Sequence, residues 1–137
     1  MWRHGPDEYS EEIKATAEWI DAHVPADAIV LVHDAGGISE FGHRRAVDLV
    51  GLKTPSSIAA HARWTWPSCV LNRGTAVSTI AHQSGASYFV GLSGWEESLS
   101  QNLTAGGFAL TPLRHPANGR LGYTVYLMEP SDHMRDR

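Results

Sequence analysis

Hydrophobic residues recur along the chain at two different spacings, which predicts both helices and strands. In the segment from about residue 10 to residue 23, apolar residues return every three or four positions, as on one face of a helix: Ile13, Ala17, Ile20 and Val24. The next segment, 28–32, is apolar without interruption. Such a run is typical of a strand that is covered on both faces, as in an α/β sheet.

The same reasoning predicts a second strand at 45–50, which we expect to pair in parallel with the first through a helical turn near 38–41. Thr54 and Pro55 resemble the start of a short helix that continues to about Ala62. Residues 63–68 are expected to be irregular.

In the second half of the chain, glycines and capping residues mark the ends of the predicted elements. A helix at 72–83 should end at Gly85, and a strand follows at 87–92. Ser93 and Glu96 have the spacing of a capping box, so a helix is expected from there to about residue 104. The apolar segments 108–113 and 123–128 are joined by a turn-rich link, which predicts an antiparallel hairpin.

Together these elements predict an α/β fold: a mixed sheet of about five strands with helices packed on it. We expect a single domain over residues 10–130, preceded by an N-terminal lead at 1–9 and followed by a tail at 131–137. The chain has 137 residues, of which 42% are hydrophobic and 19% are charged, as expected for one globular domain.

Charge and composition exclude several classes of function. The net charge of −4 and the scattered basic residues argue against a nucleic-acid partner. Cys69 is the only cysteine, so the chain has no internal disulfide and no cysteine-based zinc site. No apolar run approaches the roughly 18 residues of a membrane-spanning helix.

The best candidate ligand site is the loop after the first strand, because ligands of open α/β sheets bind beyond the carboxyl ends of strands. It contains two hydrogen-bonding side chains, a hydroxyl and two glycines: His33, Asp34, Gly36, Gly37 and Ser39. The glycines would allow backbone N–H groups to approach a ligand. Alternatively, they only form the turn, and Asp34 caps it.

Asp48 is the second candidate, because a carboxylate inside an apolar strand is costly unless it is hydrogen-bonded or exposed. It either faces Asp34 across the strand ends as part of a site, or pairs with Arg44, Arg45 or a backbone amide as a structural anchor.

Trp64 and Trp66 are the third candidate, since such rings can stack on sugars, although they can equally close the end of a small core. The eight histidines are dispersed, and only His33, Asp34 and His43 could converge on a metal. No nucleophile motif is present. The sequence therefore predicts no metal, no cofactor and no catalytic residue.

Three segments carry a family resemblance. They are a Trp-containing helix that ends before a proline (17–25), a strand followed by Asp-x-Gly (29–38), and the string Val-Asp-Leu-Val-Gly-Leu (47–52). Phe41 occupies the position of a short aromatic turn that accompanies these segments in the family named next. The chain resembles the soluble C-terminal domain of bacterial multi-spanning membrane glycosyltransferases, the mannosyl- and arabinosyltransferase-like enzymes that use polyprenyl-phosphate sugars.

The resemblance covers about residues 15–55 and implies an extracytoplasmic domain at the bacterial inner membrane. Its partners would be the membrane-embedded portion of the same polypeptide and an acceptor glycan. In such enzymes the catalytic carboxylate lies between early membrane helices, so no catalytic residue carries over. Asp34, Gly36, Asp48 and Gly51 match the shared pattern but receive no role from it.

Three hypotheses follow for the function. The first is a non-catalytic accessory domain of a membrane glycosyltransferase, which packs on the membrane portion or contacts acceptor glycan. The second is a free-standing small α/β hydrolase or transferase that uses His33, Asp34 and Asp48. The third is a ligand-binding or oligomerisation module.

Overall fold

The computed structural model describes residues 6–33, 38, 43–49, 54–69, 71–117 and 120–131. The elements, in chain order, are α1 (Pro6–His23), β1 (Ile29–Val32), β2 (Arg45–Asp48), α3 (Pro55–Ala60), the π-helix η1 (His61–Thr65), α4 (Arg73–Ser84), β3 (Tyr88–Leu92), α5 (Glu96–Ala105), β4 (Phe108–Arg114) and β5 (Tyr123–Pro130).

The described strands form one five-stranded mixed sheet in the order β2-β1-β3-β5-β4, which confirms the predicted α/β fold. β1 lies between two parallel neighbours, and its pairing with β2 runs from Ile29 opposite Arg45 to Val32 opposite Asp48. β5 is antiparallel to both β3 and β4, so the predicted hairpin is also confirmed. The carboxyl ends of β1, β2 and β3 therefore lie at one edge of the sheet, which we call the carboxyl edge.

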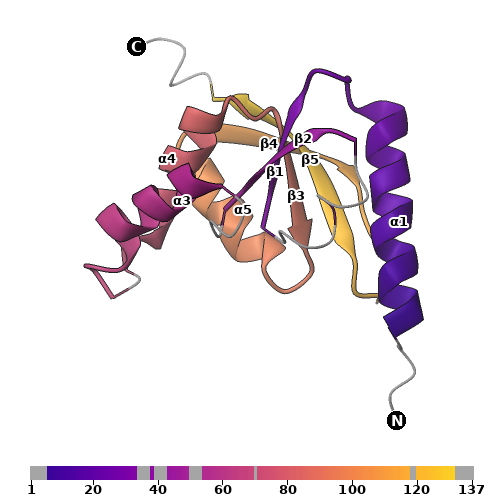
Figure 1. The fold of residues 1–137 in the computed structure, drawn as a ribbon, viewed down its shortest axis with the longest axis horizontal. Coiled ribbons are helices and arrows are strands. Elements are labelled where there is room, and N and C mark those ends of the chain that lie inside the picture. The colour runs from indigo at the N-terminus through magenta and orange to yellow at the C-terminus, as the bar shows by residue number, and fades with distance from the viewer. Residues whose placement is uncertain are drawn as a thin grey trace.

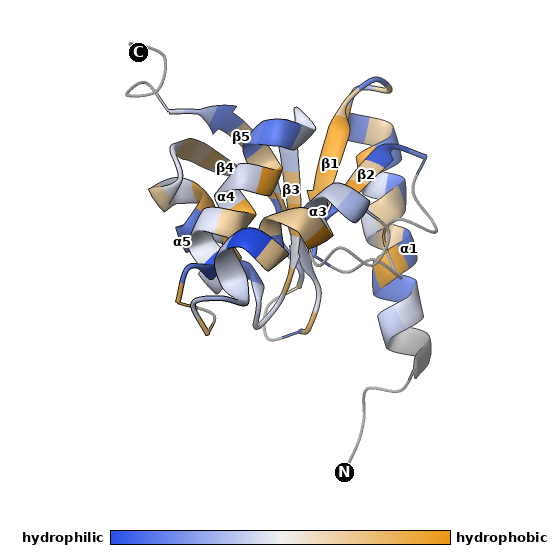
Figure 2. Ribbon diagram, turned by 60° about the vertical axis from the view of Figure 1, so that its left-hand side comes forward, coloured by the Kyte–Doolittle hydropathy of each residue, from blue (hydrophilic) through white to orange (hydrophobic). Residues whose placement is uncertain are grey.

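Helices cover both faces of this sheet. Figure 1 shows α1 alone on one face, with α3, α4 and α5 on the other. Successive residues of a strand point to opposite faces, so Val30 and Val32 pack with α1, whereas Leu31 packs with α4 and α5. β1 is hydrophobic along its whole length (Figure 2), as its position between two helical layers requires.

α1 begins at Pro6, four residues before the predicted start and inside the predicted lead at 1–9. The reason is that proline fits the first turn of a helix, where its missing N–H is not needed. Apolar periodicity begins only at Ile13, so it could not locate the first two turns. The helical turn expected at 38–41 lies outside the described residues except for Ile38, which is helical and buried.

The segment predicted to be irregular at 63–68 is partly a π-helix, because η1 continues α3 without a break. The N–H of Trp66 donates to the carbonyl oxygen of His61, five residues earlier, at 3.0 Å. The His61 ring anchors this segment, since its Nε2–H donates to the carbonyl of Leu49 at 2.6 Å and its Nδ1 bonds the Thr65 hydroxyl at 2.7 Å.

The predicted capping box at Ser93 does not form. The Ser93 hydroxyl instead donates to the carbonyl oxygen of Gly122 (2.9 Å) and accepts from its N–H (3.2 Å), which ties the end of β3 to the start of β5. α5 begins one turn later, with Trp95 as its N-cap residue and without a side-chain cap. The predicted end of α4 is confirmed, because Gly85 takes the left-handed conformation with φ of 71°.

Candidate functional site at the carboxyl edge of the sheet

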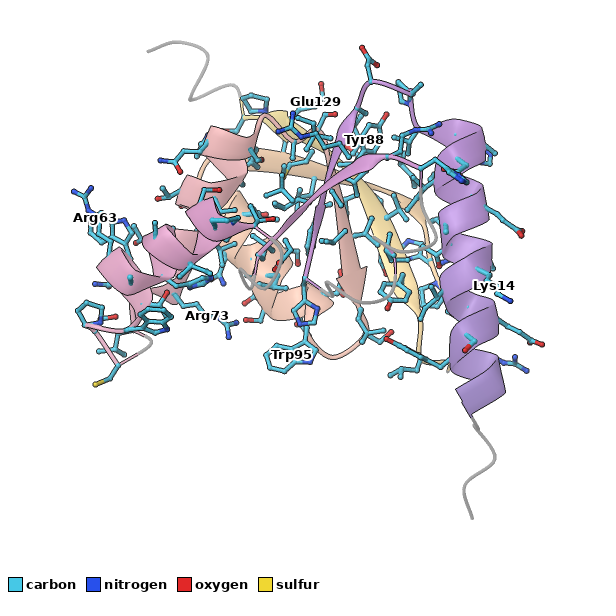
Figure 3. The ribbon with its side chains drawn as sticks, viewed as in Figure 1. Lys14, Arg63, Arg73, Tyr88, Trp95 and Glu129 are labelled. Atoms are coloured by element: carbon cyan, nitrogen blue, oxygen red, sulfur yellow. The ribbon has the colours of Figure 1, made fainter. Side chains whose placement is uncertain are left out.

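The chain leaves β1, β2 and β3 at the carboxyl edge, and the residues that follow these strands lie there. His33 follows β1, Asp48 ends β2, and Trp95 lies three residues after β3. Figure 3 shows Trp95 and Arg73 at this edge, whereas Tyr88 and Glu129 lie at the opposite end of the sheet.

Three side chains from separate parts of the chain meet here. The His33 and Trp95 rings lie with their centroids 5.2 Å apart and their planes tilted by 31°. The guanidinium carbon of Arg73, the first residue of α4, lies 6.0 Å from the centre of the Trp95 ring. Arg73 Nη2 also donates to the Ser98 hydroxyl of α5 at 3.2 Å. The result is a tryptophan ring, 49% exposed, between an imidazole and a guanidinium.

Other exposed apolar side chains belong to the segment before Arg73 and to the segment that is hydrogen-bonded to Ser93. The residues described before Arg73, 66–69, 71 and 72, include the exposed Trp66 (62% exposed) and Leu71 (87%). Leu121 (65%) precedes Gly122, which is hydrogen-bonded to Ser93 two residues before Trp95. We call this set, Trp66, Leu71, Arg73, Trp95 and Leu121, the aromatic strip. Within this set, the exposed Trp95 ring with His33 and Arg73 beside it is the candidate interaction site.

Asp48, a predicted site residue, is buried at 2% exposure. Its N–H donates to the Thr54 hydroxyl (3.1 Å), and its carbonyl oxygen accepts from the buried Ser57 hydroxyl (2.6 Å), so its backbone fixes the start of α3. Asp48 is aligned with Val32 on the α1 face, whereas His33 contacts Trp95 at the start of α5, on the other face. The two side chains therefore leave the backbone toward different faces of the sheet, both at its carboxyl edge.

Arg44 was one predicted partner for Asp48, but it lies at the other end of β2. Its guanidinium donates to the carbonyl oxygens of Asp21 (3.0 Å) and Val24 (2.9 Å), where it holds the C-terminal end of α1. Arg45, the other cationic candidate, is exposed at the first position of β2.

The two predicted tryptophans have different environments. Trp64 is half-buried against the core on the α4 side, with the Arg63 guanidinium 5.0 Å from its ring centre. Trp66 projects into solvent as part of the aromatic strip. Of the predicted loop site, His33 is described, whereas Asp34, Gly36, Gly37 and Ser39 lie outside the described residues.

The one histidine pair proposed for a metal does not converge. His43 lies two residues before β2 begins, and its Nδ1 is 2.6 Å from the Asp21 carboxylate. His33, in contrast, follows the end of β1. In the parallel register, six residues separate these two positions, which is about 20 Å at the rise of a strand. Among residues that the structure describes, no group of three or more His, Cys, Asp or Glu side chains is placed to share a metal ion.

Sequence reasoning missed Arg73 and Trp95. Trp95 carries the same signal as His33, since both closely follow a strand of the parallel half of the sheet. Arg73 carries no such signal, because only the packing of α4 against α5 brings it to this edge. Cys69 is exposed, and its backbone takes φ of 51°.

A family described as Domain of unknown function (DUF8728) matches residues 3–126, and the chain belongs to this family. No curated protein and no solved structure matches the chain. Within the described residues, no helix combines the length and the apolar character that crossing a bilayer requires.

Proposed function

We propose that this member of the DUF8728 family is a non-catalytic accessory domain of a bacterial membrane glycosyltransferase, and that its carboxyl edge contacts the acceptor glycan. Its second partner is then the membrane-embedded portion of the same polypeptide, at the extracytoplasmic face. The observation that carries the proposal is the aromatic strip, centred on Trp95. The sequence resemblance over residues 15–55 supplies the class of enzyme.

The strip has the chemistry that a glycan surface needs. A sugar ring presents C–H groups on its faces and hydroxyls around its rim. An exposed indole ring such as that of Trp95 can cover the apolar face. The Arg73 guanidinium, held beside that ring, supplies N–H donors for hydroxyl oxygens, and His33 adds a ring that can donate or accept. A second exposed ring, Trp66, belongs to the segment before Arg73.

The arrangement favours binding over catalysis. The enzyme hypothesis uses His33, Asp34 and Asp48; of these, Asp34 lies outside the described residues, and Asp48 is buried at 2% exposure. A general acid and base must both reach the reacting group within hydrogen-bond distance. The strip, in contrast, is open to solvent, as a surface that contacts an extended polymer must be.

Calorimetric titration of the domain with α-mannotriose and with an arabinose trisaccharide tests the proposal. Loss of a stacked ring costs about 1 to 1.5 kcal/mol, so we expect Trp95→Ala to weaken binding about tenfold. Ile58→Ala is the matched control, because Ile58 is exposed to a similar extent (46%) but lies on α3, outside the strip.

Equal binding by Trp95→Ala and the unaltered chain would contradict the assignment of the surface. If the domain binds neither trisaccharide, a glycan is not its partner. That result would favour the hypothesis that the domain is an oligomerisation module.

A further inference from the structure

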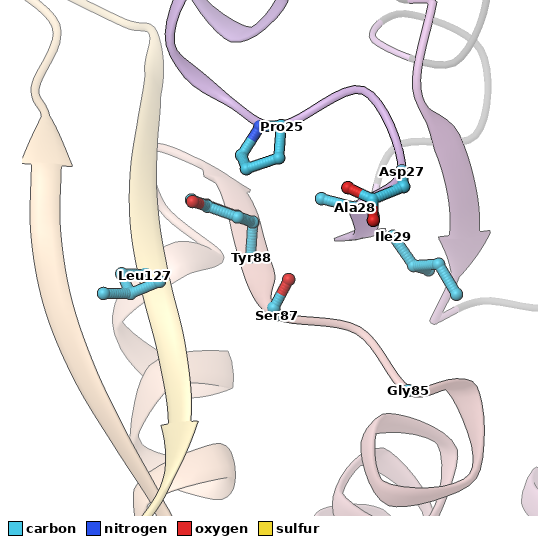
Figure 4. A pocket seen from close by; sticks show the side chains of 8 residues that line it. All are labelled: Pro25, Asp27, Ala28, Ile29, Gly85, Ser87, Tyr88 and Leu127. Atoms are coloured by element: carbon cyan, nitrogen blue, oxygen red, sulfur yellow. The ribbon is translucent and has the colours of Figure 1, made fainter.

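A concave surface lies at the opposite edge of the sheet from the aromatic strip. It is a solvent-open pocket of about 290 Å³ between the turn after α1 and the amino ends of β1 and β3. Its lining residues include Pro25, Asp27, Ser87, Tyr88 and Leu127 (Figure 4). The volume lies near the lower end of the range for small-molecule sites.

The pocket has a polar end and an apolar end. In Figure 4 the Asp27 carboxylate and the Ser87 hydroxyl point toward the middle of the pocket. The Tyr88 side chain extends away from them toward β5, with its hydroxyl at the tip. Leu127, its register partner, lies on β5, and Pro25 lies above. A ligand that fills the pocket must therefore have a polar head and an apolar body.

The polar end is available to a ligand. Within the described part of the chain, the side chains of Asp27 and Ser87 make no hydrogen bond or ion pair with another residue. The backbone N–H and carbonyl of Ser87 are used by Ile29 and Met128, so recognition there falls to the side chains. Asp27 is the one charged residue among those that line the pocket, which makes it electrostatically selective for a cation.

We propose that this pocket binds a small organic ammonium ligand, with its charged nitrogen at Asp27 and Ser87 and its apolar or aromatic body against Tyr88, Pro25 and Leu127. The ammonium donates hydrogen bonds to the carboxylate and the hydroxyl. This site is separate from the carboxyl edge, so the ammonium proposal can be tested independently of the glycan proposal.

The test uses 2-phenylethylammonium as the probe, with 2-phenylethanol and phenylacetate as neutral and anionic controls of similar size. Binding is followed through the amide signals of the 15N-labelled chain. We expect the ammonium to shift the signals of residues 27, 29, 87 and 88. It should bind about two- to fivefold more tightly than the alcohol, which is the contribution of an exposed ion pair. Asp27→Asn should remove this preference, whereas Glu11→Gln, which neutralises an exposed carboxylate on α1, should keep it.

Salt gives a second readout that needs no variant. Raising sodium chloride from 20 to 300 mM should weaken binding of the ammonium but not of the alcohol. The proposal is overturned if the three probes bind alike, if Asp27→Asn keeps the preference for the ammonium, or if the shifted signals lie elsewhere in the chain. Absence of any shift at millimolar ammonium probe would overturn it too.

Discussion

Glu12 connects α1 to the C-terminal hairpin, and neutralising it should destabilise the fold measurably. One oxygen of its carboxylate accepts hydrogen bonds from Arg114 Nη1 (2.9 Å), the N–H of Tyr123 (3.3 Å) and the Thr16 hydroxyl (3.2 Å). The contacts with Arg114 and Tyr123 join residues more than 100 positions apart in sequence, on the face of the sheet that α1 covers. Glu12→Gln removes the charge and nearly preserves the shape.

The magnitude follows from how far the pair is buried. The side chains of Glu12 and Arg114 are 21% and 15% exposed, so the interaction is stronger than that of a surface ion pair and weaker than that of a fully buried one. Surface pairs contribute up to about 1 kcal/mol, and breaking a buried pair costs about 3 to 5 kcal/mol. We therefore expect Glu12→Gln to lower the free energy of unfolding by about 1.5 kcal/mol at pH 7, which corresponds to about 5 °C in Tm for a domain of this size.

The effect should depend on pH in one direction. Burial alone would raise the pKa of Glu12, but the hydrogen bonds from Arg114 and Tyr123 and the charge of Arg114 outweigh it and hold the pKa below the ordinary value of 4.5. Because the folded pKa is lowered, the carboxylate stabilises the fold above pH 4.5 and loses this contribution as the pH falls through the folded pKa. The stability difference between the unaltered chain and Glu12→Gln should therefore shrink in acid.

Urea unfolding followed by circular dichroism at pH 7 and at pH 3 measures both effects. Glu11→Gln is the matched control, because Glu11 is an exposed neighbour on the same helix, and we expect it to change stability by less than about 0.5 kcal/mol. A loss below about 0.5 kcal/mol for Glu12→Gln at pH 7, or a difference that does not shrink at pH 3, would refute this account of how α1 is held.

Substitutions at three further sites, two of them with a control variant, test the fold by the same unfolding assay. Leu103→Ala removes a side chain with 0% exposure from the core on the α4 and α5 side and should cost about 3 kcal/mol; a cost under 1 kcal/mol would contradict this packing. Gly85→Ala should cost about 1 kcal/mol through the backbone, because its φ is 71° and a Cβ there meets only Ile29 at 4.0 Å; Gly85→Asn, which tolerates this conformation better, should cost less. Ser57→Ala leaves the Asp48 carbonyl without its 2.6 Å donor and should cost about 1 to 2 kcal/mol, whereas the exposed Ser56→Ala should be nearly neutral.

The order of strands and helices could be predicted from sequence because each element carries a local signal. The continuous apolar run at 29–32 identifies a strand between two helical layers, and Gly85 marks the end of a helix through its own backbone conformation. These features depend on residues close together in the chain. Periodic apolar residues, however, indicate only which part of a helix is buried. The first turns of α1, before Ile13, lack such residues, so the start of this helix could not be predicted.

Elements that depend on distant residues could not be predicted in this way. Ser93 has the spacing of a capping residue, but Gly122, 29 positions away, takes its hydroxyl. A hydrogen bond from the His61 ring to the carbonyl oxygen of Leu49 fixes the π-helix. Nothing in the sequence pattern links these two residues, which are 12 positions apart. In both cases a tertiary contact overrides the local preference.

The candidate site shows the same division. His33 could be selected because it follows a strand of the parallel half of the sheet. The side chains of His33 and Asp48 leave toward different faces because side chains alternate along the registered strands β1 and β2. His33 lies beside Trp95 because of where α5 begins. Arg73 reaches Trp95 only because α4 packs against α5, so its part in the site required the structure.

The most direct test of the proposed function is an NMR titration of the isotopically labelled domain with α-mannotriose, read at the indole N–H signals of the tryptophans. The account predicts that the Trp95 signal shifts on saturation and that the half-buried Trp64 signal moves much less. A titration that leaves the Trp95 signal unmoved while the domain transfers or releases sugar from a polyprenyl-phosphate donor would contradict it, because the domain would then be an enzyme with its site elsewhere.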